Sequence, residues 1–208
     1  MLHLLPKIFA AIGALLGAMS CYYTVYAIVG LFATRRFAPA RRQHRYAIVI
    51  AARNEEAVIG RLLESIRLQD YPSELLTVFV VADNCTDGTA AVAREAGAIV
   101  YERFNKVQVG KGYALDFLLH RIWAEGRHYD GYILFDADNL ADPQFLREMN
   151  NAYRAGARVA QGFRDSKNPY DSVVSGCYSI YYWMMDRLHN GGRAGLGLPA
   201  MINGTGFM

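Results

Sequence analysis

The chain has 208 residues with a formal net charge of +3, and 53% of its residues are hydrophobic. This length suits one ordinary domain and is too short for two large ones once an apolar N-terminal segment is set aside. The small net charge argues against nucleic acid as a partner. Three cysteines (Cys21, Cys85 and Cys177) lie far apart and form no Cys-x-x-Cys spacing. That usage argues against a zinc site and favours a reducing compartment.

An apolar segment opens the chain, and no charged residue occurs from Ile8 to Phe32. About 20 apolar residues are enough to cross a bilayer, so the segment predicts a single transmembrane helix within residues 1–34. A cleaved signal peptide is the alternative, with Ala18-Met19-Ser20 as a passable cleavage site. The length of the apolar run and the arginines beyond it favour a retained span.

Five arginines follow this segment without an acidic residue among them: Arg35, Arg36, Arg41, Arg42 and Arg45. Positive charge beside a membrane-spanning helix stays on the cytoplasmic side and attracts anionic lipid. Residues 35–45 are therefore interpreted as a basic juxtamembrane linker with membrane lipid as a partner. The domain that follows, residues 46–208, is expected at the cell membrane and on its cytoplasmic side.

Buried strands alternate with amphipathic helices after the linker. Apolar runs predict strands at residues 46–52, 75–82, 98–101, 132–135 and 158–163. Helical periodicity predicts helices at about residues 55–69, 90–96, 113–125, 144–155 and 170–188. Asp142 is the expected N-cap of the fourth helix, with Pro143 at its first position. This order predicts an α/β fold with a doubly wound, mostly parallel sheet.

Two aspartates stand where the strand from Tyr132 should end. On an extended backbone Asp136 and Asp138 share a face, roughly 6.5 Å apart along the strand. Open α/β sheets bind ligands at the carboxyl ends of their strands, and paired carboxylates suit a Mg²⁺ or Mn²⁺ ion that carries a phosphate. A turn with two solvated aspartates is the ordinary alternative.

Polar residues also follow the first two strands. Ala52-Arg53-Asn54-Glu55 lies at a strand–helix junction, where free backbone N–H groups suit a polar or anionic ligand. Asp83 follows the second strand, where it would accept a hydrogen bond from the N3–H of a uracil or cap a turn. The sequence has neither the Gly-x-Gly-x-x-Gly spacing of a dinucleotide fold nor a P-loop, which argues against NAD and NTPase functions.

Together these segments resemble family 2 glycosyltransferases of the GT-A fold, the group that contains cellulose, hyaluronan and poly-N-acetylglucosamine synthases. Five segments in the family's order carry the resemblance: residues 52–55, 81–89, 110–116, 136–138 and 204–207. It covers nearly everything from Tyr46 to Met208. The resemblance implies that a Rossmann-like GT-A domain follows the N-terminal transmembrane helix.

The resemblance also implies a role for each matching residue. Ala51 or Ala52 and Asp83 would hold the uracil, Glu55 the ribose, Lys111 a phosphate, Asp136 the nucleotide and Asp138 the Mg²⁺ or Mn²⁺ ion. Gly204, Thr205 and Gly206 would lie on the acceptor side. The implied enzyme is membrane-anchored and moves a sugar from a UDP-sugar to a glycan or lipid acceptor, with inversion at the anomeric carbon.

The family's catalytic base, an aspartate in a Glu-Asp motif, should follow Gly204-Thr205-Gly206. It is therefore expected beyond Met208, and the chain is expected to be an N-terminal fragment. Two other functions stay open. A HAD-like phosphatase would use Asp136 as nucleophile and Asp138 as acid, although Asn139-Leu140 departs from the usual continuation of that motif. The second is a non-catalytic, membrane-bound protein that binds a nucleotide-sugar.

Overall fold

The computed structural model describes residues 4–33 and 36–208, so Arg35 of the predicted linker lies outside the described residues. Contacts divide the chain into two compact units. One is Met1–Arg36 with Phe163–Met201, and the other is Phe37–Gly162 with Ile202–Met208. The sequence-based division instead groups residues 163–201 with the sheet domain. The sequence-based boundaries at residues 34 and 45 stay a prediction of functional domains.

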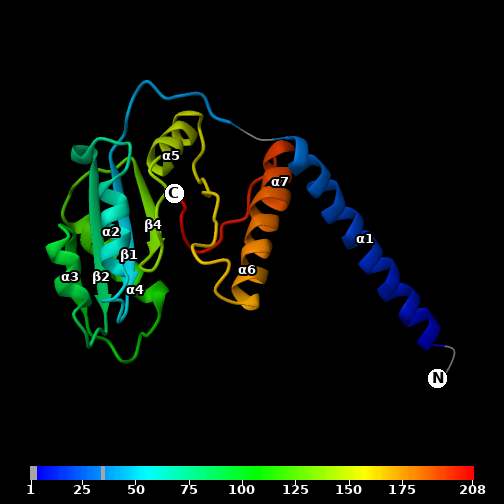
Figure 1. Ribbon diagram of the computed structural model, residues 1–208, viewed down its shortest axis with the longest axis horizontal. Helices are drawn as coiled ribbons and strands as arrows, with labels where there is room; N and C mark the ends of the chain where they lie inside the picture. The colour runs from blue at the N-terminus through cyan, green and yellow to red at the C-terminus, as the bar shows by residue number, and fades with distance from the viewer. Residues whose placement is uncertain (1–3, 34–35) are drawn as a thin grey trace. The chain divides into compact units, whose positions relative to one another are not determined.

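The second unit is built on a parallel sheet, as the α/β pattern predicts. Its strands are β1 (Tyr46–Ala52), β2 (Leu76–Asp83), β3 (Ile99–Arg103) and β4 (Gly131–Asp136). They lie in the order β3-β2-β1-β4, and every neighbouring pair is parallel. Figure 1 labels β2, β1 and β4 of this sheet. Parallel neighbours require crossover connections, so the carboxyl ends of all four strands meet at one edge.

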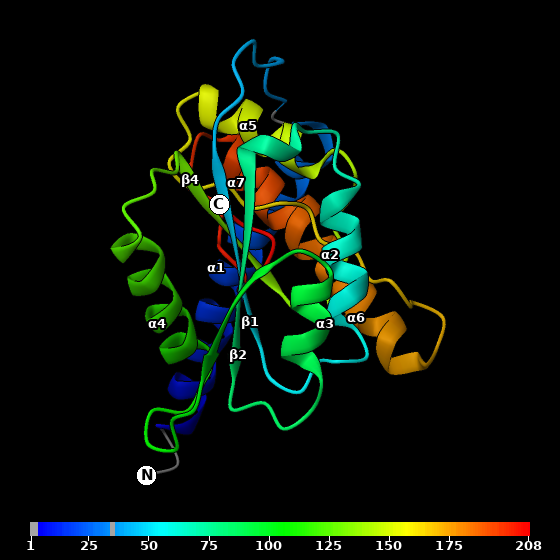
Figure 2. The ribbon, with the colours of Figure 1, turned by 90° about the vertical axis from the view of Figure 1, so that its left-hand side faces the viewer.

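Helices cover both faces of this sheet (Figure 2). The helices of this unit are α2 (Ile59–Arg67), α3 (Thr89–Glu95), α4 (Lys111–Ala124) and α5 (Phe145–Arg154), and a short turn η1 (Ser73–Leu75) precedes β2. Because side chains alternate along a strand, Ile48 and Ile50 of β1 pack with α2, α3 and α5, whereas Ala47 and Val49 pack with α4. Because both faces of β1 are buried, its sequence is a continuous apolar run.

The end of the chain pairs with β4 in the antiparallel sense. The N–H of Leu134 donates to the carbonyl of Phe207 (2.9 Å), and the N–H of Gly206 donates to that of Leu134 (2.8 Å). Ala160 and Met208 exchange two further backbone bonds. The predicted strand over residues 158–163 is wrong as a regular strand, because its partner segment is short and only Gln161 forms a bridge.

Two helices of this unit begin later than predicted. The helix expected from Glu55 begins at Ile59, after a turn in which the N–H of Val58 donates to the carbonyl of Glu55 (3.0 Å). The helix expected from about Gln144, with Pro143 at its first position, begins at Phe145. Its Asp142 carboxylate accepts from the N–H of Gln144 (2.8 Å), so it closes a turn before the helix instead of capping the helix itself.

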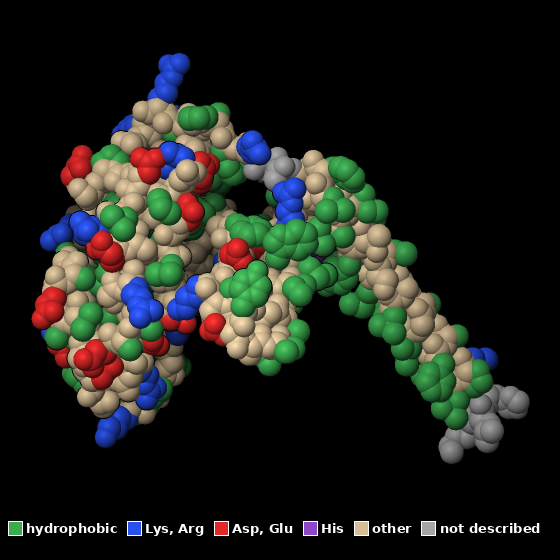
Figure 3. Space-filling view, viewed as in Figure 1, with side chains coloured by type: hydrophobic (Ala, Val, Ile, Leu, Met, Phe, Trp, Pro, Cys, Tyr) green, Lys and Arg blue, Asp and Glu red, His purple; other side chains and the backbone are tan. Residues whose placement is uncertain are grey.

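The other unit is helical. It consists of α1 (Leu5–Phe32), α6 (Val173–Trp183), the π-helix η2 (Met184–Asn190) and α7 (Gly191–Gly195). α1 is long and apolar enough to cross a membrane, and hydrophobic side chains line it in Figure 3. Glycines let it approach its neighbours closely, since a Cβ on Gly192 would lie 2.1 Å from the Tyr26 carbonyl. The helix predicted over residues 170–188 is wrong at both ends: a Ser172–Ser175 capping box delays its start, and its last turns are π-helical.

Candidate functional site

The carboxyl edge of the sheet brings together several residues predicted to bind the nucleotide. Ala51 is in register with Asp136 on β4, and Ala52 is in register with Ala82 on β2. Asp83 ends β2 directly beyond that position. The predicted positions on three separate strands therefore lie along one edge, where parallel sheets place their ligands.

The loops after β1 and β2 are tied to each other by hydrogen bonds. The Asn54 side chain accepts from the N–H of Thr86 (2.8 Å), and the Glu56 carboxylate accepts from that of Gly88 (2.8 Å). The N–H of Glu55 donates to the hydroxyl of Thr89 (2.8 Å), which is fully buried. Glu55, the predicted ribose residue, is thus fixed at its backbone by the neighbouring loop.

Two asparagines give these loops their shape. Asn54 and Asn84 have positive φ values of 56° and 53°, a conformation that asparagine tolerates better than most residues. The Asn84 amide also binds the backbone of Asn105, accepting from its N–H (2.9 Å) and donating to its carbonyl (3.1 Å). Such strained positions gather at ligand sites. Sequence reasoning missed both conformations, although an asparagine within two residues of a predicted strand end was the available signal.

A buried ion pair holds the predicted base-binding carboxylate. The Nη1 of Arg103 lies 2.6 Å from Oδ1 of Asp83, and both side chains are 6% exposed. Arg103 also donates from Nη2 to the carbonyl of Gln108 (2.8 Å). Within residues 4–33 and 36–208, the other oxygen of Asp83, Oδ2, has no hydrogen-bond partner. Arg103 is not predictable from local sequence, because its pairing depends on the β2–β3 register that places it opposite Asp83.

On the β4 side, Lys111 links three of the predicted segments. Its ammonium contacts the Asp136 carboxylate and donates to the carbonyl of Gly204 (2.8 Å). The N–H of Asp136 donates to the hydroxyl of Thr205 (2.8 Å), and that hydroxyl contacts the side chain of Asn139. Lys111 is also the first residue of α4, so this cluster lies at the positive end of a helix.

Asp138 lies in a turn and not on an extended strand. β4 ends at Asp136, and the N–H of Asn139 donates to the Asp136 carbonyl (3.1 Å). Ala137 between the two aspartates is buried, whereas Asp136 is half-buried and Asp138 is exposed. Among the described residues no three His, Cys, Asp or Glu side chains cluster as a metal site. Two carboxylates still fit Mg²⁺ or Mn²⁺, which take few protein ligands when substrate phosphates complete the coordination.

Comparisons with known proteins identify the family of this chain. The family model described as glycosyltransferase like family 2 matches residues 44–207. The low-salt glycan biosynthesis hexosyltransferase Agl6 of Haloferax volcanii is 33% identical over 119 residues, which cover 57% of this chain and 27% of that protein. The beta-monoglucosyldiacylglycerol synthase of Synechocystis sp. is 44% identical over 104 residues, which cover 49% of this chain and 21% of that protein.

A solved structure shares the fold. The mannosyltransferase PcManGT of Pyrobaculum calidifontis, in complex with GDP-Man and Mn²⁺, matches with a TM-score of 0.60 and 24% identity, over 78% of this chain and 47% of that one. The chain therefore spans less than half the length of each of these proteins. Since the family model matches nearly the whole chain beyond the N-terminal segment, the chain belongs to the glycosyltransferases of the family-2-like group.

Proposed function

We propose that this chain binds a UDP-sugar at the carboxyl edge of its sheet and forms the donor side of a metal-dependent glycosyltransferase. The observation that carries the proposal is the cluster of Lys111, Asp136 and Thr205, which lies on the same sheet edge as Asp83. A phosphate-binding cation, two carboxylates and a base-recognising carboxylate are the groups that a nucleotide-sugar requires.

Asp83 would recognise the base. Its Oδ1 is bonded to Arg103 and Asn84, so Oδ2 is left to accept from a donor on the base. Uracil offers N3–H and guanine offers N1–H at the matching edge, whereas adenine presents an acceptor there. The GDP-Man of PcManGT makes a guanine nucleotide the alternative. We favour uracil because the resemblance of residues 81–89 to the family's motif implies it.

Lys111 would bind a donor phosphate. Its ammonium is half-exposed and already neutralises a carboxylate, so an incoming diphosphate can take the place of Asp136 as its partner. Asp136 and Asp138 would hold Mg²⁺ or Mn²⁺. When bound, the ion would neutralise charge on the departing diphosphate. Glu55 would contact the ribose from the loop after β1.

The acceptor would approach from the side of residues 204–206. Hydrogen bonds to β4 hold this segment beside Asp136. In the proposed reaction an acceptor hydroxyl would attack the anomeric carbon from the face opposite the departing diphosphate. Attack along that line inverts the anomeric centre. The Haloferax relative is named for glycan biosynthesis and the Synechocystis relative for a glucosyldiacylglycerol, which supports a glycan or lipid acceptor.

The proposal places the enzyme at the cell membrane, anchored by α1. The length and apolar character of α1 support a span, and Arg36, Arg41 and Arg42 support a cytoplasmic catalytic side. A cysteine replacing the exposed Arg61 of α2 should react with an impermeant label only after cells are permeabilised. Labelling of intact cells would contradict this orientation.

Calorimetric titration tests the donor site. The chain should bind UDP more tightly than ADP in Mn²⁺, and EDTA should weaken the UDP affinity. Asp138→Ala should remove the metal dependence, whereas Glu95→Ala, which removes an exposed carboxylate of α3, should leave it unchanged. Equal UDP binding with and without EDTA would contradict the metal role. Tighter binding of GDP than of UDP would overturn the uridine assignment.

A further inference from the structure

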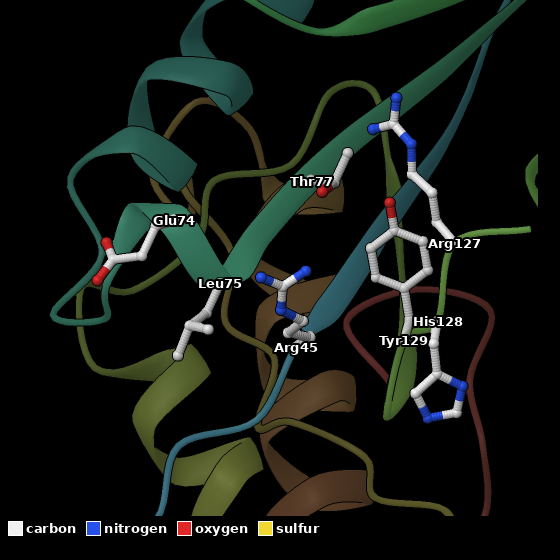
Figure 4. A pocket seen from close by; sticks show the side chains of 7 residues that line it. All are labelled: Arg45, Glu74, Leu75, Thr77, Arg127, His128 and Tyr129. Carbon is white, nitrogen blue, oxygen red and sulfur yellow. The ribbon is translucent and has the colours of Figure 1, made fainter. Parts of the chain in front are cut away.

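We propose a second ligand site at the opposite edge of the sheet: a pocket for a phosphate group, either free or as a monoester. The pocket has a volume of about 170 Å³ and is lined by Arg45, Glu74, Leu75, Thr77, Arg127, His128 and Tyr129 (Figure 4). Arg45 immediately precedes β1, Thr77 is the second residue of β2, and Tyr129 lies just before β4. The site is therefore formed at the amino ends of three strands.

Hydrogen-bond donors in this pocket lack protein partners. Within the described part of the chain, the Arg45 guanidinium and the hydroxyls of Thr77 and Tyr129 form no hydrogen bond. Arg127 adds a second guanidinium, of which Nε pairs with Glu125 at 3.1 Å. Figure 4 shows Arg45, Thr77, Tyr129 and Arg127 gathered around the pocket, while the carboxylate of Glu74 is directed away from them. Two guanidinium groups with hydroxyls between them match the oxygens of a phosphate.

The backbone holds these donors in place without a ligand. The N–H of Arg45 donates to the carboxylate of Asp130 (2.9 Å), and the N–H of Asp130 donates to the carbonyl of Arg45 (2.8 Å). The Tyr129 ring packs edge-on against Phe79 and Tyr132, which fixes the direction of its hydroxyl. Thr77 is fixed by its register with Ala47. A site that is ordered in advance loses little entropy when it binds an anion.

This pocket is separate from the donor site. β1 runs between the two edges, and seven residues at about 3.3 Å each separate them by roughly 20 Å. Two sources of phosphate suit the location. Free phosphate is one, and the other is an anionic lipid headgroup, since only eight residues lie between Arg36 and Arg45 and the connection spans at most about 30 Å.

Titration with inorganic phosphate tests the site in the full chain in phosphatidylcholine nanodiscs, with UDP and Mn²⁺ present to fill the donor site. We expect one phosphate to bind, and Arg45→Ala to weaken its affinity roughly tenfold to a hundredfold because a charged hydrogen bond is lost. Thr77→Val, which keeps the side-chain shape, should weaken the affinity by a smaller factor. Arg61→Ala, a matched loss of an exposed arginine on α2, should have no effect.

Adding phosphatidic acid to the nanodiscs separates the two sources. If the pocket takes a lipid headgroup, the phosphatidic acid should block inorganic phosphate; if it takes free phosphate, the titration should be unchanged. Either result supports the site. Absence of phosphate binding, or binding that Arg45→Ala leaves intact, would overturn the proposal. Neither of those results depends on whether UDP is the donor.

Discussion

The carboxyl edge of the sheet has an ion pair beside β2 and another beside β4, and the two pairs differ in burial. Beside β2, Asp83 and Arg103 are paired with each side chain only 6% exposed, whereas beside β4, Lys111 and Asp136 are paired with 40% and 38% exposed. Separating a buried pair leaves an uncompensated charge in a poorly hydrated place. An exposed pair exchanges its partner for water or a ligand at little cost.

This difference indicates that the two halves of the edge have different roles in binding. The β2 half, with its cross-linked loops and left-handed asparagines, is fixed before a ligand arrives and suits recognition of a planar base. The β4 half is held by a pair that a diphosphate and a cation can replace. We therefore expect loss of the Asp83–Arg103 pair to change mainly the free energy of unfolding, and loss of the Lys111–Asp136 pair to change mainly ligand affinity.

The largest effect should come from Arg103→Met. This change leaves the Asp83 carboxylate buried without its partner, so the free energy of unfolding should fall by roughly 3–5 kcal/mol. Urea denaturation followed by far-UV circular dichroism would measure it. Arg94→Met, which breaks the exposed Arg94–Glu102 pair, is the matched control and should cost less than about 1 kcal/mol.

A double variant sharpens this result. Asp83→Leu combined with Arg103→Met replaces both charges by apolar groups and should recover much of the stability lost by Arg103→Met alone. If the single and double variants were equally unstable, the loss would come from packing of the Arg103 side chain and not from an unpaired charge.

The second effect is on affinity. Lys111→Met should weaken UDP binding about tenfold, or about 1.4 kcal/mol, because the donor phosphate loses a cation. The free energy of unfolding should change by less than about 1 kcal/mol, since the Lys111–Asp136 pair is half-exposed. Lys106→Met, in the exposed loop before α4, is the control for general charge. A large loss of stability in Lys111→Met would refute the contrast between the two halves.

The sequence predicted the sheet and its polar edge because both follow from local pattern. Apolar runs of β-branched residues mark β1 and β2, and Asp83 and Asp136 end their strands as expected. Arg103 was not predicted, because its partner is set by the β2–β3 register and not by its neighbours in the chain.

Helix ends were the weaker part of the prediction. Pro143 marks the start of α5 within two residues, but the turn closed by Asp142 delays the helix to Phe145. The π-helical turns at Met184–Asn190 were not foreseen, because periodicity does not separate them from an α-helix. The Lys111–Gly204 contact joins residues 93 positions apart, which no local pattern reports.

A smaller effect should follow from Thr205→Val. The hydroxyl of Thr205 accepts from the N–H of Asp136, so its removal should cost about 1 kcal/mol of unfolding free energy and loosen residues 204–206 from β4. Thr205→Ser keeps the hydroxyl and should retain most of that stability. Hydrogen exchange of the Asp136 amide would measure the change directly. An unchanged exchange rate in Thr205→Val would mean that this bond does not hold the segment.

The smallest effect is on how the stability of the β2 half depends on pH. Hydrogen bonding from the Thr89 hydroxyl lowers the pKa of Asp87, and this outweighs the opposing effect of burial. Near the ordinary aspartate pKa of about 3.9, the unfolded chain therefore binds more protons than the folded chain. The stabilisation is present above that pH. It is lost as the pH falls through the pKa of Asp87 in the folded chain. Asp87→Asn keeps an acceptor for Thr89 but does not titrate. It should flatten the acid limb of the urea midpoint plotted against pH. An identical acid limb in Asp87→Asn and in the unmodified chain would show that this bond adds no pH-dependent stability to the fixed half.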